Sequence, residues 1–316
     1  MPPESNIPLV LGTRASALAL WQARFVKAEL EQSGYDVHLQ ELTTKGDRIL
    51  DVPLADIGDK GLFTKELDLA LLQGRIHLAV HSLKDLPTRL PEGITLAAVT
   101  EREEPWDAFV PHPDYERRLE DLPEGAVIGT SSLRRQAQLK AWRPDLRIVS
   151  VRGNVDTRLA KLDASDWHGL ILATAGLVRL GMDRRIGQRI DPGIMLPAVG
   201  QGALGVVCAE MDTETIELLQ GVLHHGPTAW GTQAERAFLR RLEGGCQVPI
   251  GAHARLENDE LVLDGCVAAE DGTELYRGRR TGSPEHAEAL GTQLAEILLE
   301  RGAGRILQQI RTAHPY

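Results

Sequence analysis

Cysteine is scarce in this 316-residue chain, with three residues at positions 208, 246 and 266. Their spacing matches neither a disulfide framework nor a paired zinc motif, so we expect no metal site and a reducing compartment, the cytoplasm. No apolar run reaches the ~18 residues that a membrane span requires. The N-terminus also lacks a cationic segment followed by an apolar one, so no secretory signal is predicted.

Positive charge is in deficit as well, because 35 Lys and Arg face 45 Asp and Glu, a formal net charge of −10. A general nucleic-acid binder would carry a basic surface and a high pI, so that class is disfavoured. The hydrophobic share of 42% suffices for sizeable cores, and the length predicts two or three domains.

Cys246 differs from the other two cysteines in its surroundings. Cys208 and Cys266 stand within apolar strand patterns, whereas Cys246 follows a helical pattern over Thr232–Leu242 and two glycines. Glycine often ends a helix because it readily adopts positive φ. The proline and glycine that follow Cys246 indicate a tight loop. The thiol is therefore predicted on a loop, where cysteine chemistry usually occurs, although an ordinary loop cysteine remains an alternative.

The first segment opens with a strand at residues 8–12 and a helix over Ala17–Gln32. Ser16 is the predicted N-cap, so Arg14 and Ser16 lie at a strand-to-helix junction, where free backbone N–H groups favour anions. A solvated arginine is the alternative for Arg14. Residues 43–65 contain four basic residues among glycines, which indicates a mobile loop and weakly favours an anion site.

A second strand, at Arg75–His81, is followed by Lys84 and Asp85 before a proline. In parallel α/β sheets, ligands bind beyond the carboxyl ends of the strands. A carboxylate on this short turn is therefore a candidate functional group. A turn-forming aspartate is the alternative.

Basic residues recur beyond three later strands, at Ala126–Thr130, Leu146–Val151 and Gly169–Ala173. Arginine in the first turn of a helix is electrostatically misplaced unless an anion lies nearby. Their repetition at strand-to-helix junctions predicts a cationic cleft within an acidic protein. The residues are Arg134, Arg135, Arg152, Arg158 and Arg179.

Two stretches rich in charge, proline or glycine, 100–106 and 196–202, are predicted linkers that let the chain leave a first domain and return to it. Such a double crossing allows hinge motion around a cleft. Further on, alternating strands at Ala252–Glu257, Leu261–Ala269 and Glu274–Arg280, joined by short turns such as Asn258-Asp259, predict an antiparallel sheet. Helices over 284–301 and 303–312 would cover one of its faces.

Taken together, nine stretches in order along the chain resemble the porphobilinogen deaminase (hydroxymethylbilane synthase) family. The set is highly specific, although any single stretch could occur by chance. They are GTRAS (12–16), TKGD (44–47), GDKGLFTKEL (58–67), AVHSLKDLP (79–87), EREEP (101–105), GTSSLRRQ (129–136), VRGNVDTRL (151–159), LPAVGQGA (196–203) and RLEGGCQVPIG (241–251).

The resemblance implies an α/β fold with two hinged domains like those of type II periplasmic binding proteins, and a smaller C-terminal α+β domain with a three-stranded antiparallel sheet. Domain one would comprise residues 1–101 and 202–220, domain two 106–196 and domain three 226–316. The family is usually monomeric and needs no metal.

The resemblance also implies a reaction: four porphobilinogen molecules are joined head to tail into the linear tetrapyrrole hydroxymethylbilane, with release of ammonia, in tetrapyrrole and heme biosynthesis. The chain would grow on a dipyrromethane cofactor held by a thioether at Cys246. Asp85 would be the catalytic carboxylate, because it can pass a proton to departing ammonia and stabilise positive charge on the substrate.

The carboxylates of the growing chain require cationic and hydroxyl partners. The matching cofactor-binding positions, besides Cys246, are Lys84, Ser132, Arg134 and Arg135. The matching substrate-binding positions are Arg14, Ser16, Lys60, Phe63, Arg152, Arg158, Arg179 and Gln201.

Two other functions remain open from the residues. Two hinged α/β domains with a cationic cleft also describe a solute-binding protein, which would carry nothing covalently bound. A thiol hydrolase or acyltransferase would pair Cys246 with His224, His225 or His253. The patterns place those histidines on a helix surface and a strand.

Overall fold

The computed structural model describes residues 8–44, 64–115, 118–242 and 248–313. The chain divides into two compact units. The first unit holds residues 8–44, 64–103 and 203–229, and the second holds the remaining described residues. Within the described residues, the chain passes between the units at 103/104, 202/203 and 229/230. The first two crossings lie in or beside the two predicted linkers, and the third lies within the helix over Gly226–Arg241.

The first unit is a five-stranded mixed sheet in the order β2-β1-β3-β10-β4. β1 pairs in parallel with β2 and β3, whereas β10 runs antiparallel between β3 and β4. Its strands are β1 (Leu9–Thr13), β2 (Val37–Glu41), β3 (Leu78–Ser82), β4 (Ile94–Val99) and β10 (Leu204–Ala209), and its helices are α1 (Ala17–Gln32), α3 (Lys65–Leu72) and α7 (Thr213–Leu223).

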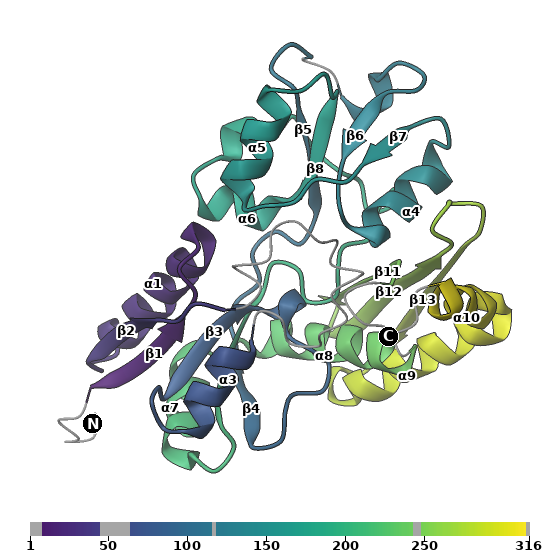
Figure 1. The fold of residues 1–316 in the computed structure, drawn as a ribbon. Coiled ribbons are helices and arrows are strands. Elements are labelled where there is room, and N and C mark those ends of the chain that lie inside the picture. Colours follow the sequence, from purple (N-terminus) through teal and green to yellow (C-terminus); the bar gives the residue numbers. More distant parts are fainter. Residues whose placement is uncertain (1–7, 45–63, 116–117, 243–247, 314–316) are drawn as a thin grey trace. The chain divides into compact units, whose positions relative to one another are not determined.

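Helices α1, α3 and α7 pack against this sheet (Figure 1). An apolar cluster covers each of its two faces. One cluster joins Val26 of α1 and Leu219 of α7 to strand residues such as Val206. The other joins Leu67 of α3 to Val207 of the same strand. Because successive strand residues point to opposite faces, β10 contributes to both clusters and is buried along its length.

The second unit begins with a sheet of the same design, in the order β7-β6-β8-β5-β9. β6 pairs in parallel with β7 and β8, whereas β5 runs antiparallel to β8. Its strands are β5 (Asp107–Pro111), β6 (Val127–Gly129), β7 (Arg147–Val149), β8 (Gly169–Ala173) and β9 (Gln188–Arg189), with helices α4 (Leu133–Trp142), α5 (Val155–Asp163) and α6 (Thr174–Arg179).

The rest of the second unit is an antiparallel sheet of β11 (Ile250–Glu257), β12 (Glu260–Ala268) and β13 (Leu275–Gly282). Asn258 and Asp259 join β11 to β12 in the left-handed region, at φ 51° and 67°, which a two-residue hairpin requires. One face of the sheet packs on α8 (Gly226–Arg241), α9 (Ala287–Leu298) and α10 (Gly304–Ala313), which enclose the largest apolar cluster.

These sheets confirm the predicted α/β fold class, with two mixed α/β sheets and a C-terminal three-stranded antiparallel sheet. The three domain ranges stay a prediction. Several bounds differ from the sequence patterns: β3 begins at Leu78 rather than Arg75, and α8 begins six residues before Thr232. The C-terminal helical region is interrupted at Gly302, whose φ of 116° separates α9 from α10.

Candidate functional site

A pocket in the first unit brings Arg14, Ser16 and Asp85 together. Arg14 and Ser16 follow β1, and Asp85 ends the 3-10 turn Leu83–Asp85 that follows β3. β1 and β3 are parallel neighbours, so their carboxyl ends meet at one edge of the sheet. Ser16 is the N-cap of α1, as predicted: its Oγ accepts a hydrogen bond from the Ala19 amide at 3.3 Å.

The same pocket is lined by two buried side chains that the residue patterns did not single out, Gln22 and His81. The amide of Gln22 donates to Ser82 Oγ at 2.8 Å, tying α1 to β3. His81 Nε2 is buried and has no hydrogen-bond partner within the part of the chain that the structure describes. Burial, reinforced by the charge of Arg14, lowers the pKa of His81 to about 4, so the imidazole is neutral near pH 7.

A neutral imidazole with an unpartnered buried nitrogen is costly unless something in the pocket completes its hydrogen bonding. His81 lies within AVHSLKDLP, so the signal for it was present in that stretch. Lys84, by contrast, is in the 3-10 turn but is not among the residues that line the pocket.

In the second unit, Arg134 and Arg135 are buried against one carboxylate, Asp107. Arg134 Nη1 donates to Asp107 Oδ2 and to the Leu196 carbonyl, both at 2.7 Å. Arg135 Nε and Nη2 donate to Asp107 Oδ1 at 3.0 and 2.7 Å. Burial alone would raise the pKa of Asp107, but the two guanidinium groups hold it well below its usual range.

Gln201 joins this cluster, since its amide donates to Asp107 Oδ1 at 3.0 Å and to the Pro105 carbonyl at 2.7 Å. The arginines in the first turn of α4 predicted a nearby anion, and within the protein that anion is the carboxylate of Asp107. Asp107 was not singled out from the sequence, because nothing local connects the first residue of β5 to a helix 27 residues later. Cofactor or substrate contacts by these three residues stay a prediction.

The three other arginines predicted as site residues in the second unit follow β7 and β8. Arg158 Nε donates to the Gly153 carbonyl at 2.8 Å, and Arg179 Nη2 donates to the Gly202 carbonyl at 2.5 Å. Arg152 Nη1 is buried and, among the described residues, has no acceptor. Ser132 occupies the N-cap position of α4 without a side-chain cap hydrogen bond. An unpaired buried guanidinium nitrogen is a position that a ligand carboxylate would satisfy.

Cys246, Lys60 and Phe63 lie outside the described residues. The other two cysteines are fully buried, as predicted, and burial raises the pKa of both thiols, that of Cys208 to about 11. His225 Nδ1 contacts Thr228 Oγ1 at 2.8 Å, and His253 lies on β11. Within the described residues, no helix is long and apolar enough to cross a membrane, and no cluster of three His, Cys, Asp or Glu could hold a metal.

Comparison with known proteins gives two family matches. The model "Porphobilinogen deaminase, dipyromethane cofactor binding domain" matches residues 9–217, and "Porphobilinogen deaminase, C-terminal domain" matches residues 231–300. Proteins named porphobilinogen deaminase from Prochlorococcus marinus (strain MIT 9303) and Desulforudis audaxviator (strain MP104C) are each 54% identical to this chain. Both alignments cover 96% of this chain, and 97% and 98% of the respective relatives.

Solved structures with a partly similar arrangement include two binding proteins. The methionine binding protein MetQ has a TM-score of 0.44 and 13% identity, over 68% of this chain and 89% of its own. A periplasmic substrate-binding protein of an ABC transporter from Coxiella burnetii has a TM-score of 0.42 and 14% identity, over 72% of this chain and 96% of its own.

The fold and the pocket define a class: an α/β protein with two five-stranded mixed sheets of the same design, a C-terminal three-stranded antiparallel sheet, and a carboxylate beside an arginine at a sheet edge. The two family matches, with relatives at 54% identity over nearly the whole chain, make the identification specific. The chain belongs to the porphobilinogen deaminase family, the hydroxymethylbilane synthases of tetrapyrrole biosynthesis, and contains their dipyrromethane-cofactor-binding domain.

Proposed function

We propose that this chain joins four porphobilinogen molecules into hydroxymethylbilane with release of ammonia, and that Asp85 is its catalytic carboxylate. The observation that carries the residue assignment is the pocket at the ends of β1 and β3, where Asp85 lies with Arg14 and Ser16. Porphobilinogen bears carboxylates and an amine that leaves as ammonia. The pocket offers a cation for the former and a carboxylate that can move a proton to the latter.

The residues of the chain fit a carboxylate-rich dipyrromethane. Two buried polar atoms, Arg152 Nη1 and His81 Nε2, have no partner among residues 8–44, 64–115, 118–242 and 248–313. His81 lies near the end of β3, and Arg152 follows β7. Arg152, Arg158 and Arg179 would hold acidic groups, as would Lys84, and Cys246 would form the thioether. When bound, dipyrromethane supplies the pyrrole carbon to which the first substrate unit is joined.

Asp85 acts in this proposal through charge and proton position. It is exposed at the end of its turn, so it can meet the amine of an entering substrate. After ammonia leaves, the same carboxylate stabilises the positive charge shared with the pyrrole nitrogen. At about 4 Å and an effective dielectric of about 20, such a contact contributes about 4 kcal/mol, enough to change a rate by orders of magnitude.

Arg134, Arg135 and Gln201 support the site in a second way. By holding Asp107 at the start of β5, they fix the beginning of α4 and the 196–202 segment against the sheet. Ser132 stands two residues before Arg134, so this cluster also helps to position its hydroxyl. We also propose that the chain is a monomer and that it acts in the cytoplasm. Light scattering during size-exclusion chromatography would test the first point, and cell fractionation the second.

The test begins with the intact mass of the purified full chain, which should exceed the mass of the bare polypeptide by that of a dipyrromethane. Cys246→Ala should show the bare mass and no turnover of porphobilinogen, followed as ammonia release and as porphyrin absorbance after oxidation. Cys208→Ala is the matched control and should keep the added mass. A bare wild-type chain, or normal turnover from Cys246→Ala, would refute the anchor.

A further inference from the structure

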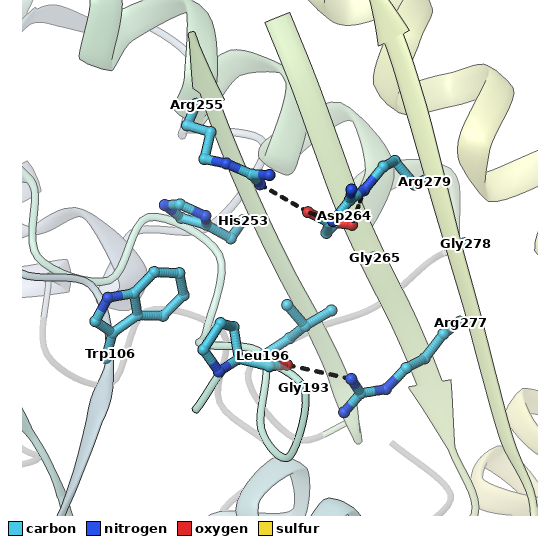
Figure 2. Close-up of a pocket in the computed structure, with 11 residues that line it drawn as sticks. Trp106, Gly193, Leu196, His253, Arg255, Asp264, Gly265, Arg277, Gly278 and Arg279 are labelled. Carbon is cyan, nitrogen blue, oxygen red and sulfur yellow. Dashed lines mark hydrogen bonds and ion pairs between the residues drawn. The ribbon is translucent and has the colours of Figure 1, made fainter. Parts of the chain in front are cut away.

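A second cavity, of about 470 Å³, lies on the face of the β11–β13 sheet that is turned away from the helices (Figure 2). It is lined by side chains of all three strands and by Trp106 and residues 192–196. None of the described site residues that the family resemblance predicts lines it, whereas His253, one of the alternative partners considered for Cys246, does. Its volume is within the range of about 300–1,000 Å³ that is typical of sites for one small molecule.

Strand register explains why charged residues gather here. His253, Asp264 and Arg279 are directly opposite one another across β11, β12 and β13. Arg255 and Arg277 are two residues from His253 and Arg279, so side-chain alternation puts them on the same face. The neighbouring positions, such as Ala252 and Leu263, point into the apolar cluster under the helices.

The charges on this face do not balance. Asp264 accepts hydrogen bonds from Arg255 Nη1 and Arg279 Nε, each at 2.7 Å. Glu257, which does not line the cavity, accepts from Arg255 Nε at 2.6 Å. Two carboxylates therefore compensate two arginines, and the third, Arg277, is left over.

Arg277 contacts only uncharged acceptors among the described residues. Its Nη1 donates to the Pro192 carbonyl at 3.1 Å, and its Nη2 donates to the Ile194 carbonyl at 2.9 Å and to Gln138 Oε1 at 3.3 Å. Cys266, opposite Arg277 in the register, adds no anion, because burial raises the pKa of its thiol. The cavity thus has one uncompensated positive charge, fixed by three hydrogen bonds.

The opposite side of the cavity is aromatic. Trp106 and His253 have ring centroids 4.6 Å apart at an interplanar angle of 58°. Figure 2 shows both rings across the cavity from Arg277. An indole face favours contact with a flat ring and contributes binding energy beyond its area.

We propose that this cavity binds a small aromatic or heteroaromatic carboxylate, with the carboxylate toward Arg277 and the ring against Trp106. The lone uncompensated arginine suits one carboxylate, and a charge-assisted hydrogen bond to a guanidinium is about twice as strong as a neutral one. The volume suits a single ring with its substituents, and the site is distinct from the Asp85 pocket, with which it shares no residue.

The test is a calorimetric titration of the full chain with pyrrole-2-carboxylate. Wild type should bind it saturably, and inorganic phosphate at least tenfold more weakly. Arg277→Gln should weaken binding of pyrrole-2-carboxylate at least tenfold, and Trp106→Leu should weaken it at least fivefold. Arg277→Lys, which keeps the charge, should retain affinity within threefold. Arg185→Gln, at a surface arginine that pairs with Asp163 and lines neither pocket, is the matched control and should bind within twofold of wild type.

Absence of saturable binding by wild type would overturn the proposal, as would wild-type affinity in Arg277→Gln. Phosphate binding as tight as pyrrole-2-carboxylate would overturn the aromatic part of the ligand class. If Arg277→Gln does not fold, as judged by thermal denaturation, Trp106→Leu decides. Because the readout is binding, a chain without porphobilinogen turnover would still give a result.

Discussion

Arg135 donates from two nitrogens, Nε and Nη2, to a single oxygen of Asp107, and both side chains are buried. Arg134 and Gln201 hold the same carboxylate. This carboxylate therefore joins the start of β5, the first turn of α4 and the 196–202 segment. Removing a charge from such a group leaves its partners buried without compensation.

We expect Asp107→Asn to lower the free energy of unfolding by about 3–5 kcal/mol, the usual cost of breaking a buried ion pair. Urea denaturation measures it. Asp163→Asn is the matched control: Asp163 pairs with Arg185 at 2.6 Å on the surface, so its loss should cost less than about 1 kcal/mol. If both variants lost the same free energy of unfolding, burial would not explain the contribution of the Asp107 cluster to stability.

Asp85→Asn preserves the size of the side chain and removes its charge. We expect the rate of porphobilinogen consumption to fall at least about 100-fold, because proton transfer and charge stabilisation are both lost. Intact mass should show that the cofactor is still attached. A rate within tenfold of wild type would contradict the catalytic role of Asp85.

Arg14→Gln removes the cation that lines the pocket with Asp85. We expect KM for porphobilinogen to rise about tenfold or more, since a charged contact to a carboxylate contributes about 1.5–3 kcal/mol. Steady-state kinetics measure it, with Arg75→Gln as control, because Arg75 Nε donates to Gln73 Oε1 at 2.9 Å on the surface, outside the pocket. An unchanged KM in Arg14→Gln would contradict the proposal that Arg14 binds substrate.

His81 makes stability depend on pH. Its pKa is about 4 in the folded chain against 6.5 for the free side chain, so between these values the unfolded chain binds the extra proton. The free energy of unfolding should therefore fall as pH decreases from about 6.5 to 4, by up to about 3 kcal/mol. Denaturation across this range should show a smaller decline in His81→Asn. Parallel curves for both proteins would exclude His81 as the cause.

Two helical glycines should respond oppositely to alanine. A Cβ on Gly291 of α9 would lie 2.1 Å from the Ala234 carbonyl of α8, so Gly291→Ala should destabilise the chain by about 1–3 kcal/mol. Gly221 of α7 has no atom within 4 Å of such a Cβ, so Gly221→Ala should stabilise it by about 0.5–1 kcal/mol. Thermal denaturation compares them, and a shared sign would contradict the packing of α8 on α9.

The sequence predicted best the features that depend on neighbours along the chain. The junction of Arg14 and Ser16 after β1, the hairpin at Asn258 and Asp259, and the burial of Cys208 all follow from local patterns. Arg14 and Asp85 were each predicted beyond the end of a strand, and they line one pocket because parallel strands present their carboxyl ends at one edge.

Features that depend on distant partners were missed. Asp107 compensates α4 across 27 and 28 residues, and no periodicity encodes that pairing. β4 and α7 were overlooked for a different reason, since their signals are present. The apolar run at 94–99 and the N-cap Asp212, whose side chain accepts from the Thr215 amide at 3.0 Å, mark both elements.

The late arrival of β10 has a consequence for synthesis on the ribosome. This strand is hydrogen-bonded between β3 and β4, yet it follows them by more than a hundred residues. A nascent chain that has emerged only to residue 200 therefore holds two strands with open edges, which are templates for aggregation. The sheet of β5–β9 needs no later strand. Termination of synthesis near residue 200 would therefore release a chain with one complete sheet and one incomplete sheet.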